Sequence, residues 1–84
     1  MKYKVMILRR ALKELGQLPH EAYEQVRDAI LALSGEPRPR HCRKLAGREG
    51  WRIRVGQYRV VYEIDDPQQV VTVMHVGHRR DVYR

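Results

Sequence analysis

The sequence has almost no cysteine and no long apolar run, and each absence narrows the class of protein. Cys42 is the only cysteine among 84 residues, so no disulfide can form within the chain. A chain of this kind is typical of a reducing compartment, and we therefore expect a cytoplasmic location. No stretch approaches the roughly 20 apolar residues of a membrane span, and residues 1–10 lack the apolar core of a signal peptide. We expect no membrane association.

Metal ligands and repeats are equally sparse. His41 and Cys42 are adjacent, but a zinc site needs about four ligands. We therefore predict no metal and no cofactor. The chain has no internal repeats or low-complexity tracts, and its 84 residues predict one domain over residues 1–84.

Acidic residues are outnumbered by basic ones. The chain has 17 Lys and Arg against 10 Asp and Glu, which gives a formal net charge of +7. An excess of this size on a short chain favours a polyanionic partner such as nucleic acid. The alternative is a soluble basic protein without such a partner, and charge alone does not separate the two.

The hydrophobic pattern predicts two helices and four strands. The spacing of Ala11, Leu12 and Leu15 predicts a helix over residues 9–16, and a second apolar stripe predicts one over about residues 19–33. Strands are expected at residues 3–8, 51–55, 58–64 and about 70–76, and residues 35–50 are irregular. The predicted class is α+β in the order β-α-α-β-β-β. Two antiparallel helices cover one face of a small four-stranded, mainly antiparallel sheet, followed by a short C-terminal tail.

Residues 51–62 predict a β-hairpin whose two faces differ. If Gly56-Gln57 is a two-residue type II′ turn, Val55 lies opposite Tyr58 and Arg54 opposite Arg59. Like charges in that relation destabilise a hairpin, so an anionic ligand is expected there. The residues expected to face the helices are Trp51, Ile53, Val55, Tyr58, Val60 and Tyr62, and those expected on the open face are Arg52, Arg54, Arg59 and Glu63.

Three segments of the chain carry a family resemblance. They are Lys44-Leu45-Ala46-Gly47, the hairpin from Trp51 to Tyr62, and the tail Val76-Gly77-His78-Arg79-Arg80-Asp81-Val82-Tyr83. In this order they resemble the RelE/ParE superfamily of toxin–antitoxin toxins, and specifically RelE-type ribonucleases. The resemblance implies a metal-independent endoribonuclease that cleaves mRNA in the ribosomal A site. In this reaction a ribose 2′-hydroxyl attacks the adjacent phosphate, and the cleavage of mRNA inhibits translation. The resemblance also implies a cognate RelB-like antitoxin that neutralises the toxin in a hetero-oligomer.

The resemblance also implies roles for individual residues. Arg59 matches a phosphate-stabilising arginine, Arg79 a tail arginine that contacts the leaving group or phosphate, and Tyr83 a tyrosine that stacks on or orients the substrate. Arg52 and Arg54 stand where the best-known RelE pattern has lysine. The expected catalytic residues are Arg52, Arg54, Arg59, Arg79 and Tyr83, and the expected RNA-binding residues are Lys44, Arg48, His78 and Arg80.

The departure from lysine leaves the general base open. Lysine can lose a proton when its pKa is depressed, but arginine effectively cannot. Arg52 is then expected to act through charge and position, and Glu63 and His78 are alternative bases. His75 lies in an apolar strand and is expected to be structural.

Two other functions remain open. A ParE-like toxin has the same fold but inhibits DNA gyrase without cutting RNA, and the basic face together with Arg79 and Tyr83 favours the nuclease over it. A catalytically inactive module would only bind RNA or the antitoxin. The replacement of lysine by arginine keeps that second alternative open.

Overall fold

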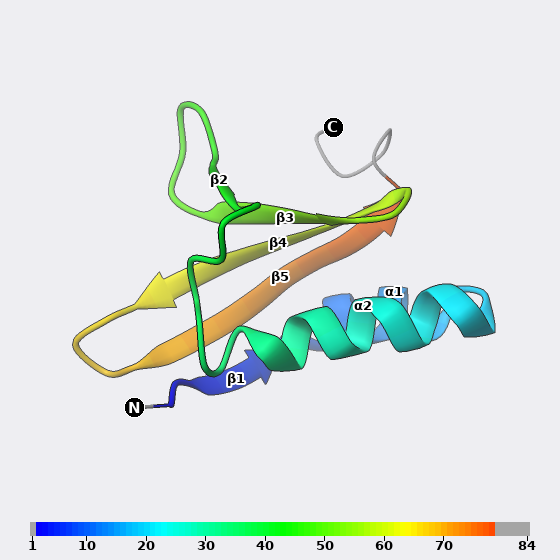
Figure 1. Ribbon diagram of the computed structural model, residues 1–84, viewed down its shortest axis with the longest axis horizontal. Helices are drawn as coiled ribbons and strands as arrows, with labels where there is room; N and C mark the ends of the chain where they lie inside the picture. Colours follow the sequence, from blue (N-terminus) through cyan, green and yellow to red (C-terminus); the bar gives the residue numbers. More distant parts are fainter. Residues whose placement is uncertain (1, 79–84) are drawn as a thin grey trace.

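Two helices cover one face of a single sheet (Figure 1). The structure, a computed structural model, describes residues 2–78. Its elements are β1 (Lys4–Ile7), α1 (Arg9–Gly16), α2 (His20–Ala32), β2 (Arg43–Lys44), β3 (Trp51–Val55), β4 (Tyr58–Asp65) and β5 (Val70–His78). The five strands lie in the order β1-β5-β4-β3-β2. The predicted α+β class is confirmed, with one strand more than expected.

The additional strand is β2, which lies in the stretch expected to be irregular. Arg43 pairs with Arg52, and Lys44 pairs with Trp51, in antiparallel register. Two residues are too few to show the alternation by which a strand is recognised, so the sequence pattern does not predict β2. The prediction of four strands was wrong for this reason.

Strand β5 lies inside the sheet, between β1 and β4. It runs parallel to β1, with Lys4 opposite Val70 and Ile7 opposite Val73, and antiparallel to β4. Inner strands of a covered sheet are apolar along most of their length, as this segment is. The prediction that residues 70–76 form a central strand is confirmed.

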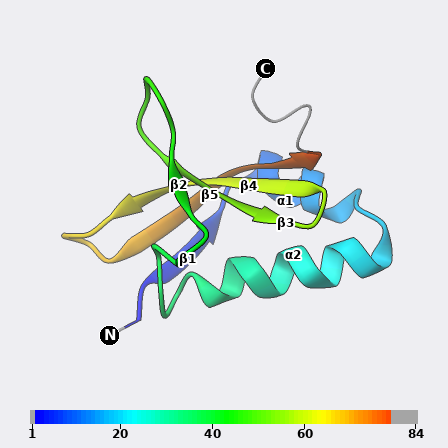
Figure 2. The ribbon, with the colours of Figure 1, turned by 45° about the horizontal axis from the view of Figure 1, so that its top comes forward.

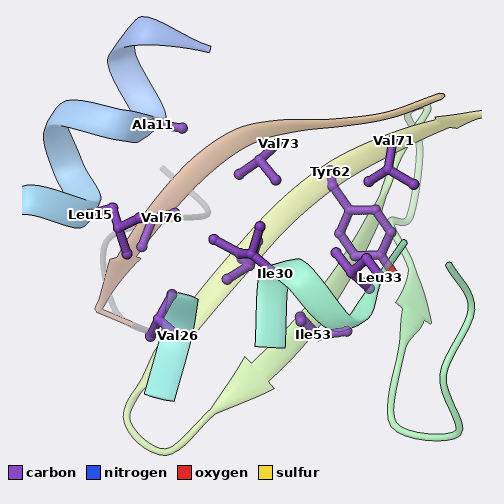
Figure 3. Packing of buried hydrophobic residues seen from close by; sticks show 11 residues of the cluster. Ala11, Leu15, Val26, Ile30, Leu33, Ile53, Tyr62, Val71, Val73 and Val76 are labelled. Atoms are coloured by element: carbon purple, nitrogen blue, oxygen red, sulfur yellow. The ribbon is translucent and has the colours of Figure 1, made fainter. Parts of the chain in front are cut away.

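The core lies between the helices and the sheet face that they cover (Figure 3). Its buried side chains are Ala11, Leu15, Val26, Ile30, Leu33, Ile53, Val60, Tyr62, Val71, Val73 and Val76. Trp51, Val55 and Tyr58 are partly buried against this cluster, so the predicted apolar face of the hairpin is confirmed. The buried Tyr62 hydroxyl donates a 2.7 Å hydrogen bond to the Pro37 carbonyl, and burial raises the pKa of Tyr62 well above its usual value.

A polar cluster joins several distant segments around Asp66. The Asp66 carboxylate accepts hydrogen bonds from the Tyr3 hydroxyl at 2.6 Å and from Arg38 Nη2 at 2.8 Å. These bonds, led by the one from Arg38, lower the pKa of Asp66. The Arg38 guanidinium also lies 5.1 Å from the centre of the Trp51 ring, and the Lys44 ammonium lies 5.3 Å from it. The cluster fixes the connection between α2 and β2 against the sheet.

The hairpin between β3 and β4 has the predicted register. Val55 lies opposite Tyr58, Ile53 opposite Val60 and Arg54 opposite Arg59. Gly56 has a φ of 61° and Gln57 is not among the positive-φ residues, as a type II′ turn requires. Because side chains alternate along each strand, this register decides which residues share the face opposite the helices.

Across residues 2–78, neither helix combines the length and the apolar character needed to span a lipid bilayer.

Candidate nucleic-acid interface

The sheet face opposite the helices carries Arg52, Arg54 and Arg59, and we call it the arginine face. Arg54 is exposed, whereas Arg52 and Arg59 are half-buried. Arg54 and Arg59 lie directly opposite each other on β3 and β4. Side chains in that relation have Cβ atoms about 5 Å apart, so two permanently charged side chains leave the sheet at adjacent positions. Guanidinium groups placed in this way can bind one phosphate from two sides.

A further arginine extends this row on β2. Arg43 lies opposite Arg52, so the two share a face of the sheet. Arg43 Nη1 donates a 3.0 Å hydrogen bond to the Cys42 carbonyl. The sequence pattern does not indicate Arg43, because a two-residue strand shows no alternation. The row therefore continues to the sheet edge, which suits a chain of phosphates better than a single anion.

A histidine lies on the same face beside the arginines. His75 on β5 is opposite Val61 on β4, two pairs along from Arg59 and Gly77. Val61 is only 2% exposed, and the His75 side chain is 22% exposed. His75 is therefore accessible at the border of the arginine face, a position that its apolar sequence context did not indicate.

Charges from two other elements act on His75. Its Nδ1 atom lies 3.9 Å from Glu14 Oε1 on α1. Burial lowers the pKa of His75, the positive charges of Arg10 and Arg48 lower it further, and Glu14 opposes them by raising it. Arg10 and Glu14 are four residues apart on α1 and share one side of that helix. Arg48 belongs to the connection between β2 and β3, which rises on the side of the sheet away from α2 (Figure 2).

The arginine face becomes acidic toward the turn between β4 and β5. Glu63 is exposed and lies opposite Thr72. It contributes with Asp65 and Asp66 to a hollow of about 530 Å³ whose lining also includes Met6. Glu63 is four residues from Arg59, which corresponds to roughly 13 Å along a strand. An anion is therefore favoured at the hairpin end of the face and disfavoured at the turn end.

Two of the residues expected to bind RNA lie away from the arginine face. Lys44 is opposite Trp51 and places its ammonium over that ring, on the side of the sheet that carries the helices. His78 is opposite Tyr58, on the same side, and the two rings meet edge to face at 6.0 Å. The structure does not bring Lys44 and His78 together with Arg52, Arg54 and Arg59. Arg79, Arg80 and Tyr83, also expected at the site, lie outside the described residues.

The arrangement of strands and helices agrees with that of a known class of small toxins. Residues 5–83 match the family model described as "ParE toxin of type II toxin-antitoxin system, parDE". The chain therefore belongs to the RelE/ParE family of toxins from type II toxin–antitoxin systems.

Individual relatives support the same assignment. Toxin RelG of Mycobacterium tuberculosis is 37% identical over 89 residues, which cover 100% of this chain and 99% of RelG. The toxin in the archaeal RelE–RelB complex from Pyrococcus horikoshii superposes with a TM-score of 0.84 at 30% identity, covering 98% of this chain and 100% of that chain. For the intact Escherichia coli RelBE complex the TM-score is 0.79 at 32% identity, covering 90% of this chain and 95% of that chain. The resemblance to RelE/ParE toxins inferred from sequence is confirmed.

Proposed function

We propose that this toxin is a metal-independent endoribonuclease that cleaves mRNA in the ribosomal A site and so inhibits translation. The observation that carries the proposal is the cross-strand pair of Arg54 and Arg59. Like charges directly opposite each other disfavour strand pairing, and a phosphate bound between them offsets the repulsion. The similarity of this chain to Toxin RelG and to the RelE of the archaeal RelE–RelB complex supports the proposal.

The chemistry assigned to this face is cleavage without added water. A ribose 2′-hydroxyl attacks the adjacent phosphate, and the 5′-oxygen of the next nucleotide leaves. Negative charge builds on the phosphate oxygens in the transition state, where Arg54 and Arg59 stabilise it because they stay charged throughout. Arg52 and Arg43 hold the neighbouring phosphates, and Arg79 and Tyr83 of the tail are proposed to complete the site.

The proposed partners follow from the same relatives. The similar structures from Pyrococcus horikoshii and Escherichia coli are complexes with an antitoxin, RelB. We infer a cognate RelB-like antitoxin for this chain, which forms a toxin–antitoxin hetero-oligomer and covers the basic surface. Ribosomes and mRNA are the proposed targets, which places the activity in the cytoplasm.

The decisive experiment maps the ends of mRNA on programmed ribosomes incubated with the purified toxin. Wild-type protein should produce new 5′ ends within the A-site codon and should cut naked RNA poorly. Arg59→Ala should lose this activity. Arg27→Ala is the matched control, because Arg27 lies on α2 beside Tyr23 and Asp28, within the helix layer. Unchanged mRNA in the presence of wild-type toxin would contradict the proposal.

A second candidate function is inhibition of DNA gyrase, favoured by the description of the family model as ParE. Gyrase supercoiling assays with the same preparation separate the two activities. Blocked supercoiling together with intact ribosome-bound mRNA would select the gyrase inhibitor. Binding to ribosomes without either effect would select the inactive binding module.

A further inference from the structure

We propose that His75 is the general base that removes the proton from the attacking 2′-hydroxyl. This assignment rests on the proposed ribonuclease function and supplies the group that the arginine face lacks. Arginine effectively cannot lose its proton, so neither Arg52 nor Arg54 can perform this step. Imidazole is the side chain best suited to exchange a proton near neutral pH.

The strand register places His75 at the required position. Arg59 lies opposite Gly77 and Val61 lies opposite His75, so His75 and Arg59 are diagonal neighbours across β4 and β5. Diagonal neighbours on one face have backbones about 7–8 Å apart. A phosphodiester held by Arg59 therefore has its adjacent ribose within reach of the imidazole. Val61, the residue opposite His75, is apolar and only 2% exposed.

The ring has a carboxylate neighbour on α1. Nδ1 is the ring nitrogen near Glu14, at 3.9 Å from Oε1. The same oxygen accepts a 3.0 Å hydrogen bond from the backbone N–H of Val76, which holds the carboxylate in place. Nε2, on the opposite side of the ring, is the atom that would take the proton. A carboxylate near Nδ1 stabilises the imidazolium that forms when it does so.

The charges around His75 favour the neutral ring before reaction. Arg10 and Glu14 face it from α1, Arg48 from the connection between β2 and β3, and Arg59 from β4. Burial, Arg10 and Arg48 lower the pKa of His75 below that of a free imidazole, and Glu14 limits this decrease. The neutral form is therefore the main form at pH 7, as a base requires.

The other candidates for the base are less well placed. Glu63 is roughly 13 Å along the strand from Arg59, beside the acidic hollow. His78 is opposite Tyr58 on the side of the helices. Among the residues that the structure describes, His75 is the neutral titratable group nearest to the arginine pair on its own face.

The proposed step exchanges one bond at phosphorus for another. The O2′–H bond breaks and the proton moves to Nε2 of His75, while O2′ forms a bond to phosphorus. The bond between phosphorus and the 5′-oxygen breaks, and that oxygen takes a proton from water. The products are a 2′,3′-cyclic phosphate and a 5′-hydroxyl, and the imidazolium returns its proton to solvent. No oxidant, reductant or metal enters the reaction.

The test compares His75→Gln with wild-type toxin on programmed ribosomes between pH 5.5 and 8. Wild-type cleavage should rise with pH through a pKa below about 6.5 and then level off. His75→Gln should cleave at least about 100-fold more slowly and lose this dependence on pH. His20→Gln is the matched control, because His20 lies at the start of α2 and pairs only with Glu24 among the described residues. It should keep both the rate and the pH profile.

Two further measurements keep a folding defect apart from a catalytic one. NMR titration of the wild-type histidines should show one, assigned to His75, with a pKa below the ordinary value. Glu14→Gln keeps an acceptor for Val76 but removes the charge, and should shift the acid limb of the rate profile to lower pH. If a folded His75→Gln variant cleaves mRNA within threefold of the wild-type rate, the role of His75 is overturned and the ribonuclease proposal is not. Absence of cleavage by wild-type toxin would overturn both the ribonuclease proposal and the role of His75.

Discussion

The Glu14 carboxylate on α1 accepts a hydrogen bond from the backbone N–H of Val76 on β5, at 3.0 Å. Strand β1 ends at Ile7, opposite Val73, so it no longer pairs with β5 at this level. The side chain of Glu14 takes the place of the missing strand neighbour. A helix thus completes the hydrogen bonding of the sheet and positions a carboxylate beside His75 in the same contact.

This contact predicts different outcomes for two substitutions of Glu14. Glu14→Ala removes the acceptor of a partly buried N–H and should lower the free energy of unfolding by about 1–3 kcal/mol. Glu14→Gln keeps an oxygen at the same position, and its free energy of unfolding should fall by less than half as much. Urea denaturation of both variants measures the difference. Equal losses for the two variants would show that the charge of Glu14, and not its acceptor oxygen, holds the contact.

Stability and toxicity should change in opposite directions at Arg54. Arg54→Glu converts the pair with Arg59 from repulsive to attractive and should stabilise the protein by about 0.2–1 kcal/mol. The same change should abolish growth inhibition, because a carboxylate in this position repels phosphate. Arg54→Gln, which only removes the charge, should fall between the two in thermal stability. A toxic Arg54→Glu variant would remove the phosphate-binding role of the pair.

The buried hydroxyl of Tyr62 should contribute measurably to stability. Tyr62→Phe removes its 2.7 Å hydrogen bond to the Pro37 carbonyl and should cost about 1–2 kcal/mol. Tyr23→Phe is the control, since Tyr23 is half-buried on α2 and keeps its ring beneath Arg27. The comparison uses chemical denaturation of both variants. A loss no larger than that of the control would mean that water satisfies the Pro37 carbonyl equally well.

Two neighbouring residues on α2 should differ sharply in their importance. Ile30 is 1% exposed and Leu31 is 57% exposed. Ile30→Ala should destabilise the protein by about 2–5 kcal/mol, because it leaves a cavity in the core. Leu31→Ala should change the free energy of unfolding by no more than about 0.5 kcal/mol. Thermal melts of the two single variants are sufficient, and similar melting temperatures would contradict the packing seen in Figure 3.

The free energy of unfolding should depend on pH through His75. Its pKa in the folded protein is lowered, mainly by burial, so the unfolded chain binds a proton more readily. The stabilising effect is present above the unfolded pKa of about 6.5 and is lost as the pH falls through the folded pKa. Denaturation at pH 7.5 and 5.5 should therefore show a smaller decrease for His75→Gln than for wild type. A decrease of the same size in both proteins would mean that other groups govern this range.

The hairpin could be predicted because its signals are local. The alternation from Trp51 to Tyr62 and the Gly56 turn together determine the pairing of Arg54 with Arg59, and that pairing is observed. The two helices were predicted from apolar spacing in the same way, and α1 was predicted with its observed bounds, Arg9–Gly16. In each case the information lies within about a dozen consecutive residues.

The features that could not be predicted depend on contacts between distant segments. Arg43 joins the arginine row only because a two-residue strand pairs with β3. Glu14 and His75 are separated by 61 residues in sequence and meet because α1 follows β1 along the edge of β5. No periodicity in either segment indicates that these two residues are neighbours in the fold. For the same reason the sequence did not place the Lys44 ammonium over the Trp51 ring.

The parallel pairing of β1 with β5 also determines when the fold can form. β5 is the last described strand in the chain, yet it lies between β1 and β4 and supplies Val71, Val73 and Val76 to the core. A nascent chain that has not reached Val70 has a first strand without a neighbour and a helix α1 without the strand on which it packs. Contacts this distant in sequence also slow folding. A ribosome that synthesises this chain therefore carries it in an unassembled state until nearly all of the described residues have been made.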